Sequence, residues 1–204
     1  GLGDVYKRQA DLVFNGSGTL NVNAGYRNGI KSTDDLKVVS GTFNITSNED
    51  GIIGKDFLGI KDGKFTIKSG SDGMKSTYDT DTSKGNIVIT GGEFDITASN
   101  DGIHCNEDIL ISGGNLTISS GDDGVHADSS LTVNGGAITV GYCYEGLEAK
   151  DIVINNGDIT ISAEDDGINA SDGSSTTQTG GFGMGGQNQS SSCLLYTSPS
   201  PRDA

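Results

Sequence analysis

Acidic residues recur at a regular spacing along this chain of 204 residues, each directly before a glycine. The series comprises Asp50, Asp72, Asp101, Asp123, Glu145 and Asp166. In three places another acidic residue precedes a member of the series, namely Glu49, Asp122 and Asp165. Ca²⁺ accepts carboxylate oxygens in irregular coordination shells. The pattern therefore predicts a ladder of candidate metal ligands with Ca²⁺ as the cofactor.

Mutual repulsion between these carboxylates is the electrostatic argument for a cation. On stacked strands, successive side chains would lie about 5 Å apart, where two unit charges repel by roughly 1–3 kcal/mol. Each single Asp-Gly pair has a simpler interpretation as a turn, in which aspartate caps the chain and glycine supplies positive φ. The doubled positions, Asp122 with Asp123 and Asp165 with Asp166, favour Ca²⁺ in addition to the turn.

Two histidines, His104 and His126, also stand one repeat apart and are expected to stack on the outer face. A metal shared by both would need further ligands, and their column continues as Lys75 on one side and Glu148 on the other. Stacked, exposed histidines are therefore the simpler expectation. We count both as candidate contacts to a substrate.

Hydroxyl-bearing and aromatic side chains supply the other candidate contacts to a sugar. Thr117 and Thr139 belong to one outward column in which threonine recurs. Threonine suits exposed strand positions for structural reasons alone, but a flat ladder of hydroxyls could also meet a regular polysaccharide or an ice surface. Tyr142 and Tyr144 are expected beside Glu145, where their rings could stack on a sugar.

Short strands in a repeat are the elements that must position these residues. Asn28-Gly29 begins the same dipeptide series, and its glycines from Gly29 onward are spaced by 22, 22, 29, 22, 22 and 21 residues, which is typical of a solenoid. Each repeat holds three alternating runs, such as "GIHC", "DILISGG" and "NLTIS", with glycine turns between them. The sequence therefore predicts an all-β fold, a single-stranded parallel β-helix with about 22 residues and three short strands per coil.

Apolar columns are expected to fill the interior of this β-helix. Ile109, Leu131 and Ile152 occupy one such column. A neighbouring inward position takes small residues such as Ala127, so Cys105 is expected to be a small buried side chain rather than a nucleophile.

The charge of the chain restricts its partners. The net charge is −15, whereas nucleic acids and anionic membranes both select basic surfaces. We therefore expect no nucleic-acid partner. The sequence contains no apolar run long enough to span a bilayer, so we expect no membrane insertion.

The two ends of the chain depart from the repeat. One codon choice for residues 1–9, read as its reverse complement in a shifted frame, encodes the stretch that begins at Cys193. Both ends resemble a transposase adapter used to prepare sequencing libraries, so residues 1–9 and 193–204 are expected to be artefacts. Between them we expect a β-helix over residues 10–173 and a loop rich in Gly, Ser and Gln over residues 174–192. Open strand edges would favour edge-to-edge self-association of such a fragment.

Several phrases of the sequence together resemble one known family. They are "SNDGIHCNEDILISGGNLTISSGDDG", "DDGVHAD" and "EDDGINAS", followed by "GGFGMGG". Over residues 10–192 the chain resembles the bacterial carbohydrate-binding domain family of secreted, calcium-containing parallel β-helices from cellulose-degrading clostridia. The resemblance implies a right-handed β-helix, Ca²⁺ between coils, a secreted or cell-surface location, and affinity for plant cell-wall polysaccharide, especially acidic pectin-type chains. Only the Asp-Gly positions given above carry over as implied ligands.

Three classes of function remain open. The first, which we predict, is a non-catalytic module that binds acidic or cellulosic cell-wall polysaccharide with the help of Ca²⁺. The second is a calcium-dependent, pectate-type polysaccharide lyase, which needs a base to take the proton beside the uronate. Lys31 and Lys75 are the candidate bases, but no acidic cluster is clearly arranged around either. The third is a structural adhesin or an ice-binding solenoid.

Overall fold

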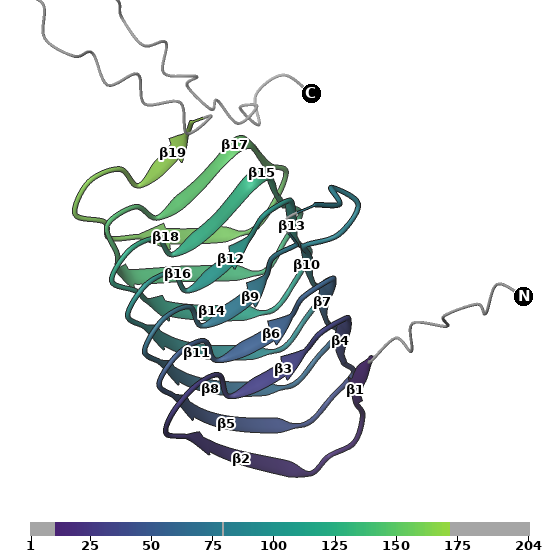
Figure 1. Ribbon diagram of the computed structural model, residues 1–204. Coiled ribbons are helices and arrows are strands. Elements are labelled where there is room, and N and C mark those ends of the chain that lie inside the picture. The colour runs from purple at the N-terminus through teal and green to yellow at the C-terminus, as the bar shows by residue number, and fades with distance from the viewer. Residues whose placement is uncertain (1–10, 79, 172–204) are drawn as a thin grey trace, which may run out of the picture. The chain divides into compact units, whose positions relative to one another are not determined.

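Parallel strands stacked coil upon coil form the structure (Figure 1), which is a computed structural model that describes residues 11–78 and 80–171. The described strands pair in parallel throughout. They form a β-solenoid of about 7 turns, with roughly 22 residues per turn and no helix among the described residues. The predicted all-β parallel β-helix is therefore confirmed.

Each coil contributes three strands, which fall into three columns. The first column follows the Asp-Gly pairs and comprises β3 (Ile30–Ser32), β6 (Ile52–Gly54), β9 (Met74–Ser76), β12 (Ile103–Cys105), the starts of β15 (Val125–Val133) and β17 (Leu147–Ile154), and β19 (Ile168–Ala170). The second column comprises β1 (Leu12–Phe14), β4 (Asp35–Val38), β7 (Phe57–Ile60), β10 (Asn86–Ile89), β13 (Asp108–Ile111) and the ends of β15 and β17. The third column comprises β2 (Thr19–Ala24), β5 (Thr42–Ser47), β8 (Lys64–Ser69), β11 (Glu93–Ala98), β14 (Asn115–Ser119), β16 (Ala137–Tyr142) and β18 (Asp158–Ile161).

The first two columns join into one sheet, and the third column forms another. β15 and β17 each run through both columns and so join them into one sheet of 12 strands. The second sheet has 7 strands in the order β18-β16-β14-β11-β8-β5-β2. Thr117, Thr139 and the two histidines lie on the outer faces of these sheets, whereas the Asp-Gly pairs lie in the turns between the third and first columns.

Apolar columns fill the interior, as the alternating pattern predicts. Ile109, Leu131 and Val133 are 0–1% exposed, and each pairs in register with its equivalents on neighbouring coils. Phe65 stacks on Phe43 and Phe94 with ring centroids 4.9 and 4.8 Å away. Full burial of such side chains contributes about 1.5–3 kcal/mol each, so these columns dominate the stability of the fold.

The inward position for small residues is also confirmed. Ser76, Cys105 and Ala127 occupy it and are 0% exposed. Burial raises the pKa of the Cys105 thiol well above its ordinary value. Cys105 is therefore a packing residue, because a buried thiol with a high pKa supplies little thiolate.

The glycines of the Asp-Gly pairs correct one sequence prediction. Positive φ was expected there, but the described glycines with positive φ lie elsewhere, including Gly114 and Gly136 in the turns between the second and third columns. The Asp-Gly glycines instead permit close approach between coils. A Cβ atom on Gly51 would lie 2.4 Å from the carbonyl oxygen of Gly73, and one on Gly102 would lie 2.4 Å from a methyl carbon of Ile118. The expectation of positive φ was therefore wrong, because these positions are restricted by space rather than by backbone conformation.

Some predictions fall outside the described residues. The adapter-like segments 1–9 and 193–204 and the loop over residues 174–192 belong to this group. Among the residues that the structure describes, none lies in a helix with the length and apolarity needed to cross a membrane.

Candidate functional site

The acidic series forms a ladder of hydrogen bonds between coils. From Asp50 to Asp101, each side chain uses one oxygen to accept the backbone N–H of the next member of the series. Asp50 Oδ1 accepts from Asp72 N at 3.2 Å, and Asp72 Oδ1 accepts from Asp101 N at 3.2 Å. Asp101 Oδ1 accepts from Asp123 N at 3.1 Å, and Asn28 begins the series with the same bond to Asp50. We call these residues the Asp ladder, and its members from Asp72 to Asp123 are buried.

The second carboxylate oxygen of each buried member faces a basic side chain three residues later. Asp72 Oδ2 lies 2.5 Å from Lys75 Nζ. One coil further, Asp101 Oδ2 lies 3.0 Å from His104 Nδ1. The local geometry causes this pairing, because the aspartate ends one corner of the coil and the basic residue points outward from the following first-column strand.

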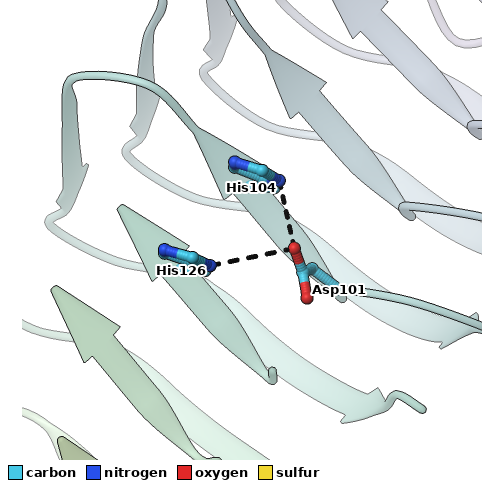
Figure 2. Close-up of side chains that lie close together, drawn as sticks. All are labelled: Asp101, His104 and His126. Carbon is cyan, nitrogen blue, oxygen red and sulfur yellow. Dashed lines mark ion pairs between the residues drawn. The ribbon is translucent and has the colours of Figure 1, made fainter. Parts of the chain in front are cut away.

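The two histidines stack, as predicted, but they are not freely exposed. The rings of His104 and His126 lie 4.9 Å apart with an interplanar angle of 4°. Figure 2 shows both Nδ1 atoms directed toward Asp101, whose Oδ2 lies 3.0 Å from His104 and 3.9 Å from His126. The Nε2 atoms face Asp128 at 3.8 and 3.4 Å. The side chains are only 21% and 26% exposed, so the prediction of exposed histidines was wrong.

Electrostatics explains why this stack forms. Burial alone would lower the pKa of His104, but the carboxylates of Asp101 and Asp72 outweigh it and raise the pKa to about 9. The close contact with Asp123 raises the pKa of His126, against burial and the charge of its stacked neighbour. His104 is therefore a cation at neutral pH and offsets the charge of the Asp ladder.

The carboxylates respond to the same cations. Burial tends to raise the pKa of Asp72, yet contacts with His104, Lys75 and Asn100 hold it well below its ordinary value. Glu148 lies next in the histidine column, where burial and the contact with Asp123 raise its pKa to about 7. Repulsion along the ladder is thus relieved by side chains of the protein at Asp72 and Asp101.

Asp122 is different, because no basic residue among those that the structure describes forms an ion pair with it. Burial and the nearby charges of Asp123 and Asp101 raise its pKa. Carboxylate oxygens of Asp101, Asp122 and Asp123 lie within 4.8 Å of one another, and Asp122 is exposed to solvent. This donor set contains oxygen only and fits a hard cation such as Ca²⁺.

The structure separates the remaining predicted metal ligands from this group. Glu145 accepts two hydrogen bonds of 3.0 Å from Nδ2 of Asn169. Asp165 is exposed, and its carboxylate raises the pKa of Tyr144. Asp166 is also exposed, at the corner before β19.

The predicted sugar contacts lie on two different sheets. Thr117 and Thr139 are exposed neighbours on β14 and β16, on the outer face of the 7-stranded sheet. Tyr142 ends β16 and is 51% exposed, and the carboxylate of Glu164 raises its pKa. The two histidines belong to the 12-stranded sheet, so the structure does not bring them together with the threonines.

Charge is distributed unevenly along the solenoid. Residues 85–171 contain 15 acidic residues and a single basic one, Lys150. Residues 11–84 contain 9 basic residues and 10 acidic ones. The later coils therefore attract cations, whereas the earlier coils are nearly neutral.

Comparison with known proteins shows the family of the chain. A family model described as "Carbohydrate-binding domain-containing protein" matches residues 4–187. Because the match spans most of the chain, the chain belongs to this family of carbohydrate-binding proteins. No curated protein and no solved structure shows significant similarity to it.

Proposed function

We propose that this chain is a non-catalytic module that binds acidic or cellulosic cell-wall polysaccharide outside the cell, with Ca²⁺ assisting. Membership of the carbohydrate-binding family, over residues 4–187, is the observation that carries the proposal. A solenoid suits this role because stacked coils repeat the same surface groups at about 4.8 Å. A polymer with a regular repeat can contact such a surface along its length.

The outer face of the 7-stranded sheet is the proposed contact surface. Thr117 pairs in register with Thr139, and Thr139 pairs with Thr160. Hydroxyl groups both donate and accept hydrogen bonds, so this exposed column can meet the hydroxyls of a sugar chain. Tyr142 adjoins the column beside Ser119 and offers an exposed ring at its edge.

Ca²⁺ would be held by Asp101, Asp122 and Asp123. These residues form the oxygen-only group, and partial burial together with its acidic neighbours raises the pKa of Asp122. A bound divalent cation would supply positive charge on a strongly acidic surface. That charge would let the surface approach an anionic polysaccharide, which the protein alone would repel.

Retardation of the chain in gels that contain polysaccharide tests the proposal. Native electrophoresis would be run in gels with polygalacturonate, soluble cellulose derivative or no polymer, each with Ca²⁺ or a chelator. We expect polymer-dependent retardation that is stronger with Ca²⁺, and weakened when Thr117 and Thr139 are both replaced by Val. The matched control is Thr132→Val on the outer face of the 12-stranded sheet. Mobility that no polymer alters would refute the proposed function.

A further inference from the structure

The outward column of the second strands mixes apolar residues with Lys37, Gly59 and Thr132, although alternation calls for polar residues there. Val13 and Val153, near its two ends, are 56% and 46% exposed. Between them, Val88 and Leu110 pair in register and are both partly exposed. Val13 and Val153 stand alone, but Val88 and Leu110 adjoin each other, and adjoining apolar residues on an outer face mark a surface that contacts something else.

A shallow depression of about 260 Å³ lies on this column over β4, β7 and β10. Its lining includes Phe57, Gly59 and Val88, with Lys37 and Lys61 among the residues around them. Ligand pockets for drug-sized molecules occupy about 300–1,000 Å³. The depression is therefore suited to a single sugar residue of a polymer that continues along the surface.

Gly59 shapes the floor of the depression. A Cβ atom on Gly59 would lie 2.6 Å from a ring carbon of Phe57, so the aromatic ring lies over the glycine. Phe57 remains partly exposed in this position. The absence of a side chain at residue 59 thus leaves room for the partly exposed ring of Phe57, which a ligand can contact.

Positive charge borders the ring. Lys37 Nζ lies 5.7 Å from the Phe57 ring centroid and also pairs with Asp35 Oδ2 at 2.7 Å. Lys61 is exposed and has no ion pair within the part of the chain that the structure describes. The ammonium of Lys61 is therefore available to an anionic group of a ligand.

We propose that this depression is a subsite for a carboxylate-bearing sugar residue and that it acts without Ca²⁺. The apolar C–H face of the sugar stacks on Phe57 and Val88, and its carboxylate pairs with Lys61. The subsite lies in the nearly neutral coils, away from the acidic residues that would repel such a ligand. This inference rests on the proposed function and names the substrate class and the residues that contact it.

Binding of a defined uronate oligosaccharide in chelator tests the subsite. Titration calorimetry would use the full chain with oligogalacturonate and, separately, a neutral cello-oligosaccharide of equal length. Phe57→Ala and Lys61→Gln should each weaken uronate binding by roughly threefold to tenfold, as expected for loss of one stacking or charged contact. Lys61→Gln should leave binding of the neutral sugar unchanged. Both side chains are solvent-accessible, so the fold should be retained, which circular dichroism checks.

Matched controls come from the same faces of the acidic coils. Val153→Ala removes an exposed apolar residue from the same column, and Lys150→Gln removes the basic residue of the later coils. Neither should change uronate binding. Equal losses in the controls, or unchanged binding in Phe57→Ala and Lys61→Gln, would overturn the subsite while leaving the proposed function intact. If the unaltered chain bound neither sugar in chelator but bound uronate with Ca²⁺, the calcium-independent subsite would be wrong and the calcium-assisted function would stand. Binding of neither sugar under either condition would overturn both.

Discussion

The Nδ1 atom of His104 lies 3.0 Å from Oδ2 of Asp101, three residues earlier in the chain. The same relationship recurs one coil on, where His126 Nδ1 lies 3.1 Å from Asp123 Oδ2. The Asp ladder thus carries its own counter-ions in these coils. A column of carboxylates, which in isolation would oppose stacking, is converted into a column of paired charges.

Loss of the imidazole should therefore destabilise the fold. His104→Gln leaves the buried carboxylate of Asp101 without its cation, and leaving a buried acceptor unpaired costs about 1–3 kcal/mol. We expect a decrease of this size in the free energy of unfolding, measured by urea denaturation. Lys64→Gln is the control, because its pair with Glu93 is exposed on both sides and such pairs contribute about 0–1 kcal/mol. Equal effects of the two substitutions would contradict the pairing.

Stability should fall as the pH rises through the alkaline range. The pKa of His104 is raised to about 9 in the folded chain, against an ordinary value of about 6.5 when unfolded. Its contribution is fully present below about pH 6.5 and is lost as the pH rises through the folded value. The pKa of Glu148 is raised to about 7 in the folded chain, so its contribution to stability is also lost as the pH rises, but at lower pH than that of His104.

Melting temperatures measured in chelator from pH 6 to pH 10 check this dependence. The unaltered chain should lose stability across the range, and His104→Gln should flatten the part of the curve between pH 7 and pH 9. A melting temperature that is constant or rises over that part in the unaltered chain would show that His104 is not charged in the folded state.

The close approach of coils at Gly102 predicts a large penalty for a single methyl group. A Cβ atom there would lie 2.4 Å from Ile118 and 2.6 Å from the carbonyl oxygen of Gly124. Gly102→Ala should destabilise the chain by about 1–3 kcal/mol through overpacking. Gly25→Ala is the control, because nothing lies within 4 Å of its added atom. Thermal unfolding of the two variants separates the effects, and a neutral Gly102→Ala would refute the spatial argument.

Much of this fold could be predicted from the sequence, because alternation with period two and the recurring glycines each leave a direct mark. The inward columns around Ile109 and the small buried Cys105 followed from that pattern alone. The role of the Asp-Gly glycines did not, since close approach and positive φ both select glycine.

The candidate site was harder to predict for a similar reason. The acidic series was evident, but the side chain that neutralises each carboxylate lies around a corner of the coil, as with Lys75 and Asp72. The outward position of Phe57 was missed because aromatic residues in strands usually face the interior. An aromatic residue two positions before a glycine, at an outward strand position, is the signal that could have revealed it.

Ca²⁺ should stabilise the folded chain through Asp122. A cation that binds only the folded state adds about 2.7 kcal/mol when its concentration is a hundredfold above Kd. We expect Ca²⁺ to raise the melting temperature, and Mg²⁺ to raise it less because it demands tighter octahedral geometry. Asp122→Asn should remove most of the calcium effect, whereas Asp95→Asn, an exposed residue of β11, should not. Identical melting curves with chelator and with excess Ca²⁺ would refute the cation site.

The central claim is that the chain binds polysaccharide without cleaving it. One measurement follows both properties: polygalacturonate is incubated with the chain and Ca²⁺, and sedimentation of the complex is recorded together with ultraviolet absorbance of unsaturated uronate products. The account predicts that the chain co-sediments with the polymer while the absorbance stays at the level of the polymer alone. Growth of the absorbance with time would identify a lyase, and failure to co-sediment with this polymer or with cellulose would contradict carbohydrate binding by this chain.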